Sequence, residues 1–398
     1  MTFLETADRL GARLCRDALW HGGRCTWLSD YARLSDQRIA HGPIGADVYT
    51  GVAGIALFLH SLAKATGESI YARTAQGALT QAIQIQHRVA PEFRAGFYHG
   101  WSGIAWVLGC AGRLEEALTL VRQIGPAARA ESDLMNGTAG VVAALVALAR
   151  AAGDRTLLEL AIQHGDQLIA CAQPDSTGLS WPWPRAEPGG RHLTGFSHGA
   201  AGIGWALLEL GGATGESRFA EAAAASFRYE QGLFDQGQGN WPDHRYAPPK
   251  FMRVWCHGAG GIGFSRLRAW QVLGTPAYRA EAETALAAVE PGVAAPNLSD
   301  FSLCHGVAGN AELLLYAQDV LGRPAPAAAQ AAALGTEHFE AQRVPWAGGL
   351  QGRDTPGLML GTAGIGNFYL RLAQPDLHVT PLMPVAPAVR PGAWCKSA

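Results

Sequence analysis

The sequence predicts an all-α protein folded as a closed α,α-toroid (barrel) of about fourteen helices in seven repeats. Three observations lead to this prediction. A short glycine signature recurs seven times, an apolar helical stretch follows each copy, and a more polar helical pattern lies between the copies. Recurrence at a spacing of about 20–50 residues is typical of repeat architectures, whose units bury their apolar faces against one another.

The repeated signature is Gly-x-x-Gly followed by apolar residues. The leading glycines of the seven copies are Gly51, Gly100, Gly137, Gly199, Gly258, Gly306 and Gly361. Successive copies are 49, 37, 62, 59, 48 and 55 residues apart, an average of about 52 residues. A unit of this length has room for two helices and a connecting loop. Seven such units account for about fourteen helices.

The fourth copy illustrates the expected helix pair. Apolar residues at i, i+3, i+4 and i+7 lie on one helical face: Ile203, Ala206, Leu207 and Leu210. Gly199 and Gly202 fall in the first turn, where the lack of a side chain lets neighbouring backbones approach. The amphipathic stretch 217–230 follows. We expect the glycine helices to form an inner ring and the amphipathic helices an outer ring.

An open α-solenoid of the HEAT or TPR type is the alternative fold. Those repeats are shorter and do not open on Gly-x-x-Gly, so the closed toroid is favoured. Two segments, 173–196 and 235–249, are rich in proline, glycine and tryptophan and are predicted to be non-helical. Loops of this length usually form functional rims or lids.

No shift in composition marks a domain boundary. We therefore expect residues 1–398 to form a single domain, with the repeats running from about 49 to 370. The proline-rich tail 381–398 is expected to be only partly ordered.

Composition and charge exclude several classes of function. Hydrophobic residues make up 48% of the chain and charged residues 16%, which suits a large core. The formal charge of −2, without runs of like charge, argues against a nucleic-acid partner. The sequence contains no uninterrupted apolar stretch of about 18 residues, so no membrane span is predicted, and no signal peptide is visible. We expect a cytoplasmic location, and the scarcity of lysine beside arginine suggests a bacterial source.

Histidine and cysteine recur in register with the repeats. Histidine precedes the leading glycine in four copies: His99, His198, His257 and His305. Cysteine stands two residues before it in two consecutive copies, as Cys256 and Cys304. Because stacked repeats bring equivalent positions to one height, both cysteines should meet at the mouth of the toroid. Either His257 or His305 could complete a metal site, and spacing alone does not choose between them.

Two thiolates and one imidazole predict a tetrahedral zinc site with an open fourth position, the pattern of catalytic sites. The near-zero net charge of such a site makes it a weaker activator of water than a three-histidine site. It suits binding of a substrate thiol, whose pKa it lowers from about 8.5. The ligand set therefore predicts thiol activation rather than hydrolysis.

Four stretches, SHGAAGIGWALLEL, GNWPDHR, WCHGAGGIGFSRL and SLCHGVAGNAELLL, resemble the lanthionine synthetase C-like (LanC-like) cyclases. They are most similar to the cyclase domain of class II lanthipeptide synthetases. The resemblance includes all seven signatures and implies an α,α-toroid with one zinc ion per chain. It also implies an intramolecular Michael-type addition of peptide cysteine thiols to dehydroalanine or dehydrobutyrine. The product is a (methyl)lanthionine thioether ring.

The resemblance also implies roles for particular residues. The family's zinc ligands match Cys256, Cys304 and His305. His257 stands where many stand-alone cyclases have tyrosine and the bifunctional synthetases have histidine, which makes it a candidate catalytic residue.

Three further catalytic candidates come from the same resemblance. His198 matches the family histidine that is proposed to transfer protons, as base toward the thiol or as acid toward the enolate carbon. Asp133 matches the aspartate expected to orient that histidine. Arg245, in the tryptophan-rich loop, is expected to stabilise the enolate charge.

A class II cyclase domain normally follows a long dehydratase domain, which 398 residues cannot contain. The expected partners are therefore a dehydrated precursor peptide and a separate dehydratase. Three other functions are considered: glutathione-type thiol addition to dehydro residues, a non-catalytic LanC-like scaffold that binds peptides or partner enzymes, and an (α/α) barrel glycosidase. A glycosidase needs two opposed carboxylates, for which Asp133 and Asp300 are the best candidates. It would leave Cys256 and Cys304 unexplained.

Overall fold

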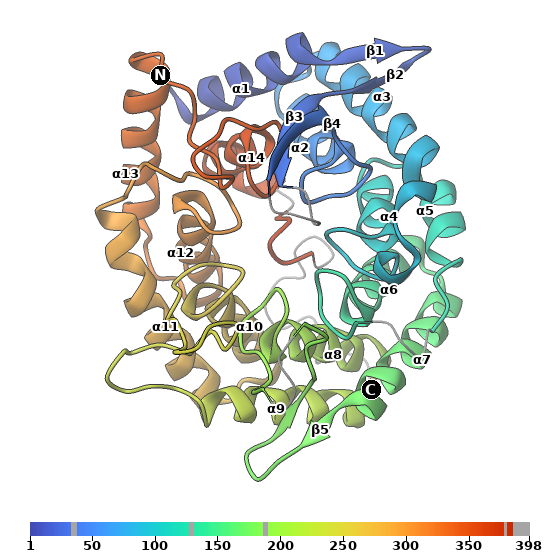
Figure 1. Cartoon of the computed structure of the whole chain (residues 1–398), viewed down its shortest axis with the longest axis vertical. Coiled ribbons are helices and arrows are strands. Elements are labelled where there is room, and N and C mark those ends of the chain that lie inside the picture. Colours follow the sequence, from blue (N-terminus) through green and yellow to red (C-terminus); the bar gives the residue numbers. More distant parts are fainter. Residues whose placement is uncertain (33–37, 127–130, 186–189, 378–379, 385–398) are drawn as a thin grey trace.

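Two concentric rings of helices surround a common centre (Figure 1). The computed structural model describes residues 1–32, 38–126, 131–185, 190–377 and 380–384. The inner ring consists of the helices that follow the seven signatures: α2 (Val52–Thr66), α4 (Trp101–Cys110), α6 (Thr138–Ala152), α8 (Ala200–Thr214), α10 (Ala259–Leu273), α12 (Val307–Leu321) and α14 (Thr362–Ala373). The outer ring consists of α1 (Phe3–Asp17), α3 (Ser69–Ile85), α5 (Leu114–Val121), α7 (Arg155–Cys171), α9 (Ser217–Gln231), α11 (Pro276–Ala294) and α13 (Pro326–Gly335). The predicted α,α-toroid is confirmed, and the described residues contain fourteen α-helices, as expected.

The outer ring is closed by the N-terminal helix. Within the described residues no α-helix follows α14, and α1 packs against α14 instead (Figure 1). Arg13 of α1 forms an ion pair with Asp354, at 2.9 Å, just before α14. Phe3 packs its ring against Tyr369 of α14, with the ring centroids 6.1 Å apart. The two ends of the repeat array are thereby joined.

The core lies between the two rings. In α8 every residue from Ala200 to Gly211 is buried, because this helix packs against the outer helices α7 and α9 and against its inner neighbours α6 and α10. In α9 burial is confined to one side, which includes Phe219, Ala223 and Phe227. The inner helices are therefore apolar on nearly all faces, whereas the outer ones are amphipathic.

Within the described residues, three short antiparallel strand pairs depart from the all-α prediction. They pair β1 (Leu19–His21) with β2 (Arg24–Thr26), β3 (Leu28–Ala32) with β4 (Ile39–Pro43), and β5 (Gln173–Pro174) with β6 (Leu179–Ser180). In the first hairpin the connection is Gly22-Gly23, and both glycines have positive φ, as a tight two-residue hairpin turn requires.

The two proline- and glycine-rich loops contain no helix among their described residues, as predicted. Segment 173–196 holds the β5–β6 hairpin, and its residues 186–189 lie outside the described part. Segment 235–249 is held by isolated bridges between Asp235 and Asn240 and between Asp243 and Lys250. Of the predicted tail, residues 385–398, Cys395 among them, lie outside the described residues.

The described start of the tail lies inside the rings (Figure 1). Tyr98 donates from its hydroxyl to the Pro381 carbonyl at 2.6 Å, and the Trp255 indole donates to the Leu382 carbonyl at 3.1 Å. Leu382 and Met383 are buried. The segment therefore packs in the centre of the toroid.

Among the helices of the described ranges, none has both the length and the apolar character of a membrane span.

The second glycine of each signature is required by a close backbone approach. A Cβ on Gly202 would overlap the carbonyl oxygen of Phe196, six residues earlier. The equivalent pairs are Val48–Gly54, Phe97–Gly103, Leu134–Gly140, Trp255–Gly261, Leu303–Gly309 and Leu358–Gly364. The backbone that approaches is thus mainly the loop of the same repeat, folded back on the first helical turn. The sequence had predicted only that neighbouring backbones approach here.

Gly202→Ala should lower the free energy of unfolding by about 1–3 kcal/mol, because the new methyl group has no room beside the Phe196 carbonyl. Gly292→Ala in α11 is the matched control, since nothing lies within 4 Å of its Cβ position. That variant should be stabilised by about 0.5–1 kcal/mol. Thermal or denaturant unfolding measures both, and equal effects would contradict the steric explanation.

A closed ring of backbone hydrogen bonds joins the seven repeats at the starts of the inner helices. At the position two residues before each leading glycine, the N–H donates to the carbonyl of the equivalent residue in the next repeat. The ring runs through Tyr49, Tyr98, Met135, Ser197, Cys256, Cys304 and Met359 and returns to Tyr49, with N···O distances of 2.8–3.3 Å. It brings Cys256 and Cys304 to adjacent positions at one mouth of the toroid.

Candidate metal centre and active site

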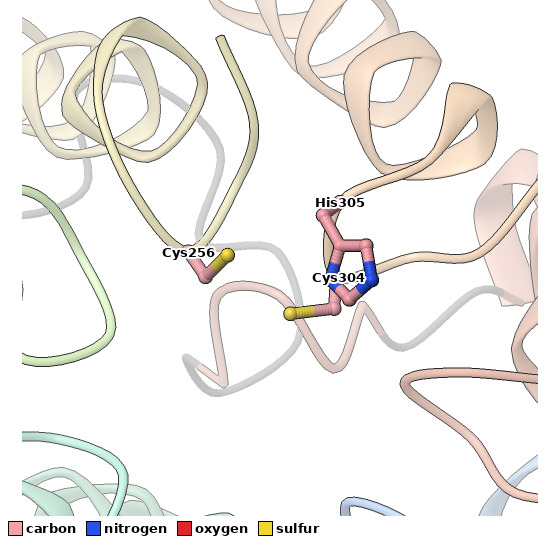
Figure 2. Close-up of side chains that lie close together, drawn as sticks. All are labelled: Cys256, Cys304 and His305. Atoms are coloured by element: carbon pink, nitrogen blue, oxygen red, sulfur yellow. The ribbon is translucent and has the colours of Figure 1, made fainter. Parts of the chain in front are cut away.

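Two cysteines and one histidine form a cluster that could hold a metal ion (Figure 2). The sulfurs of Cys256 and Cys304 and a ring nitrogen of His305 all lie within 4.8 Å of one another. Cys256 comes from the loop before α10, and the other two from the loop before α12. Cys304 is buried and Cys256 is partly buried. The register prediction that the two cysteines converge therefore agrees with their placement.

The backbone of a distant loop orients the His305 ring. Its Nε2 donates to the Gly349 carbonyl at 2.9 Å, and Asp300 Oδ2 lies 3.4 Å from the same nitrogen. A ring protonated at Nε2 leaves the lone pair of Nδ1 for a metal. A Cβ on Gly349 would lie 2.8 Å from His305 Nε2, so only glycine fits there without moving the ring.

The side chains of the cluster shift one another's pKa values. A hydrogen bond with Cys304, burial and the charge of Cys304 raise the pKa of the Cys256 thiol well above its usual value. Burial lowers the pKa of His305, but the hydrogen bond and charge of Cys256 outweigh it and raise that pKa to about 9. Because the two sulfurs and the imidazole lie so close together, a cation bound between them would stabilise their arrangement.

The cluster forms part of the wall of a cavity of about 390 Å³. Its lining residues come from at least five of the seven repeats: Tyr49, Met135, Ser197, His198, Arg245, Met252, Val254, Cys256, His257, Cys304 and His305. No carboxylate lines this cavity among the described residues. Asp133 and Asp300, the pair considered for a glycosidase, are not among the lining residues and contact His198 and His305 instead.

His198 and Asp133 form a dyad at this cavity. Nδ1 of His198 lies 2.5 Å from Asp133 Oδ2, and the other oxygen of Asp133 accepts the Asn136 backbone N–H at 2.7 Å. Asp133 is 4% exposed and is held in one orientation by these contacts. With Nδ1 engaged, Nε2 is the nitrogen of His198 that remains for the cavity. The ring stacks on His257, with centroids 5.9 Å apart and an interplanar angle of 28°.

His257 lies outside the metal cluster. Its Nδ1 is 3.9 Å from Asp243 Oδ2 and its Nε2 is 3.4 Å from Ser197 Oγ. Burial and the nearby charge of Arg245 lower the pKa of His257 to about 3, so the ring is neutral at physiological pH. Of the two histidines left open by spacing, His305 is thus the one beside both sulfurs.

Arg245 reaches the cavity from the tryptophan-rich loop. Its Nε and Nη2 donate to both oxygens of buried Asp243, at 2.7–3.2 Å. This ion pair holds the guanidinium in place, and its hydrogen bonds keep the pKa of Asp243 below its usual value although burial acts in the opposite direction. Asp243 was not singled out from the sequence, although it stands two residues before Arg245 in the same motif.

Tyr49 is a second residue of the site that was not predicted from the sequence. Its hydroxyl donates to Cys304 Sγ at 2.8 Å, and its side chain lines the cavity. A signal was present, because Tyr49 occupies the same repeat position as Cys256 and Cys304, two residues before a leading glycine.

Comparison with known proteins agrees with this architecture. A family model described as lanthionine synthetase C-like protein matches residues 42–385. Nisin cyclase is similar in structure, with a TM-score of 0.62 and 18% sequence identity, covering 83% of this chain and 89% of that one. A GH76 α-mannanase from Bacteroides thetaiotaomicron has a TM-score of 0.52 and 11% identity, with 94% of this chain and 96% of that one covered.

The structural matches have under 25% identity and show the toroid fold alone, which cyclase and mannanase share. The family match is a different observation, since it covers 344 of the 398 residues, including all seven signatures and the Cys256, Cys304 and His305 cluster. The chain therefore belongs to the lanthionine synthetase C-like family.

Proposed function

We propose that the chain is a zinc-dependent lanthipeptide cyclase. It adds cysteine thiols of a dehydrated peptide to dehydroalanine or dehydrobutyrine of the same peptide, forming (methyl)lanthionine rings. The observation that carries the proposal is the joint placement of the Cys256, Cys304 and His305 cluster and His198 on one cavity. Membership of the LanC-like family and the fold shared with nisin cyclase support it.

The donor set fits zinc. Two thiol sulfurs and one imidazole nitrogen are ligands that Zn²⁺ prefers, and three protein ligands leave the fourth tetrahedral position for a substrate. Cys256, Cys304 and His305 would hold the ion, one per chain. Bound there, zinc would lower the pKa of a peptide thiol so that it reacts as the thiolate at neutral pH.

His198 is the residue proposed to transfer protons at the reacting carbon and sulfur. Its Nε2 remains for the cavity because Asp133 occupies Nδ1. In the addition, the thiol loses a proton, the C–S bond forms at the β-carbon, and the enolate α-carbon gains a proton. A single histidine can serve as base in the first transfer and as acid in the last.

Arg245 and His257 complete the proposed catalytic set. Arg245, anchored by Asp243, lines the cavity and would stabilise the negative charge of the enolate oxygen. Neutral His257 packs against the His198 ring and supports its orientation. Enclosure of thiol and acceptor in one cavity raises their effective molarity.

Asp133→Asn should reduce turnover by about 10²-fold or more while zinc content is unchanged, because an amide no longer stabilises a protonated His198. Turnover of a dehydrated peptide and metal analysis of the same sample measure the two effects. Turnover equal to that of the wild type would show that the dyad has no part in the reaction.

The proposal predicts which thiol is added. A model peptide with one cysteine and one dehydroalanine is incubated with the enzyme and excess glutathione, and free thiols are then alkylated. An unalkylated product of unchanged mass is the ring and is the expected result. A glutathione adduct would favour glutathione-type addition, and an unreacted peptide that still binds would favour a non-catalytic scaffold.

The reaction requires a dehydrated substrate. We propose that a dehydratase partner supplies it, because class II cyclase domains act on peptides that a dehydratase has already modified. The glycosidase alternative is disfavoured because its two carboxylates, Asp133 and Asp300, are absent from the cavity lining.

A further inference from the structure

The hydroxyl of Tyr49 makes a direct contact with the proposed metal site. It donates to Cys304 Sγ across 2.8 Å. Tyr49 belongs to the first repeat and Cys304 to the sixth, 255 positions further along the chain. The contact therefore exists only because the toroid is closed.

Three sets of contacts aim the Tyr49 side chain at the sulfur. Its backbone N–H donates to Tyr98 and its carbonyl accepts from Met359 in the hydrogen-bonded ring. The phenol ring packs edge-on against Tyr98, with centroids 6.4 Å apart, and against His99, at 5.0 Å. His99 in turn bonds through Nδ1 to Asn136 Oδ1 at 2.9 Å. These contacts restrict the ring, so the hydroxyl is oriented before any metal binds.

We propose that Tyr49 is a positioning residue of the metal centre, which donates a hydrogen bond to the Cys304 thiolate and thereby fixes and tunes this ligand. The proposal rests on the proposed function, since it requires that Cys304 binds the metal. A thiolate carries no proton, so the tyrosine hydroxyl is the only possible donor in this pair.

The hydrogen bond has a defined electronic consequence. It draws electron density from the Cys304 sulfur, which then donates less to a bound cation. A cation with two thiolate ligands is electron-rich, and weakening one of them restores part of its power to acidify a substrate thiol. Tyr49 also holds the Cys304 side chain in one rotamer, which pre-organises the cluster.

The test replaces zinc by cobalt(II), whose thiolate charge-transfer absorption reports on the ligand sulfurs. Wild type is compared with Tyr49→Phe, which removes one oxygen and keeps the ring. Tyr98→Phe is the matched control, because it removes a hydroxyl from the same ring position in the next repeat, one that bonds to Pro381. Folding of each variant is checked by circular dichroism.

In Tyr49→Phe the charge-transfer band is expected to move to longer wavelength, because the sulfur lone pair is no longer stabilised by a hydrogen bond. Tyr98→Phe should keep the wild-type band. Peptide turnover by the zinc form of Tyr49→Phe should fall by about 10-fold. A merely structural role of Tyr49 would leave the band in place.

The outcomes separate this inference from the proposed function. A thiolate–cobalt band in the wild type that is unchanged in Tyr49→Phe would overturn the role of Tyr49 and leave the metal site intact. Absence of any such band in the folded wild type would overturn the metal site and the role of Tyr49 with it. Tyr49→Gln, which keeps an N–H donor, is the second variant. Its band should lie between those of wild type and Tyr49→Phe.

Discussion

Cys304→Ala is expected to abolish metal binding and cyclisation together. The variant loses one of three proposed protein ligands, and the two that remain, Cys256 and His305, do not make a tetrahedral zinc site. Zinc content, measured by elemental analysis of protein purified without added metal, should fall from near one per chain to near none. Turnover should fall by at least about 10³-fold, because the peptide thiol loses both its activation, since it is mostly protonated at neutral pH, and its positioning beside the acceptor.

The matched control is Cys171→Ala. Cys171 is exposed at the end of α7, away from the cavity, and its loss should change neither zinc content nor turnover. A folded wild type that contains no zinc would contradict the proposed mechanism. So would a Cys304→Ala variant that retains full activity. The first result would make a barrel scaffold or a metal-independent relative the better interpretation, and the second would favour a metal-independent relative.

His198→Asn is expected to separate chemistry from metal binding. The side chain is outside the metal cluster, so zinc content should stay near one per chain. Turnover should fall by about 10²–10⁴-fold, the range for loss of a general acid–base group. The ratio of these two effects distinguishes a proton-transfer residue from a metal ligand.

Two observations would argue against this role. Loss of zinc from His198→Asn would indicate that His198 supports the metal site rather than the proton transfers. An equal fall in His41→Asn, which changes an exposed histidine of β4, would indicate a nonspecific effect of the substitution. Zinc analysis and peptide turnover on the same preparations decide between these cases.

The repeat architecture was predictable because its determinants are local. The second glycine of nearly every signature is required mainly by a carbonyl only six residues earlier, so the pattern recurs wherever the loop folds back on its helix. The inner helices follow directly from it. This is why the α,α-toroid could be predicted, together with the fourteen α-helices that the described residues contain. The hairpin at Gly22-Gly23 was also signalled locally, but it lies outside the repeats and was missed.

A closed toroid was predicted, but the contacts that close it were not predictable in the same way. Helix α1 completes the outer ring by packing against α14, through pairs such as Arg13 and Asp354 that are 341 positions apart. Nothing in either local sequence identifies the partner. The tail shows the same limit, since Pro381 and Leu382 are bound at the centre by hydrogen-bond donors of Tyr98 and Trp255.

The sequence by itself determined the repeat unit, and repeat register brought Cys256 and Cys304 to adjacent places in the hydrogen-bonded ring. Register sets the height of a residue but not the direction of its side chain. Only the tertiary structure directed His305 toward both sulfurs, through the Gly349 carbonyl, and His257 toward Asp243. It alone placed Tyr49 on Cys304. These contacts join loops far apart in the chain, and their partners are chosen by packing once the ring has closed.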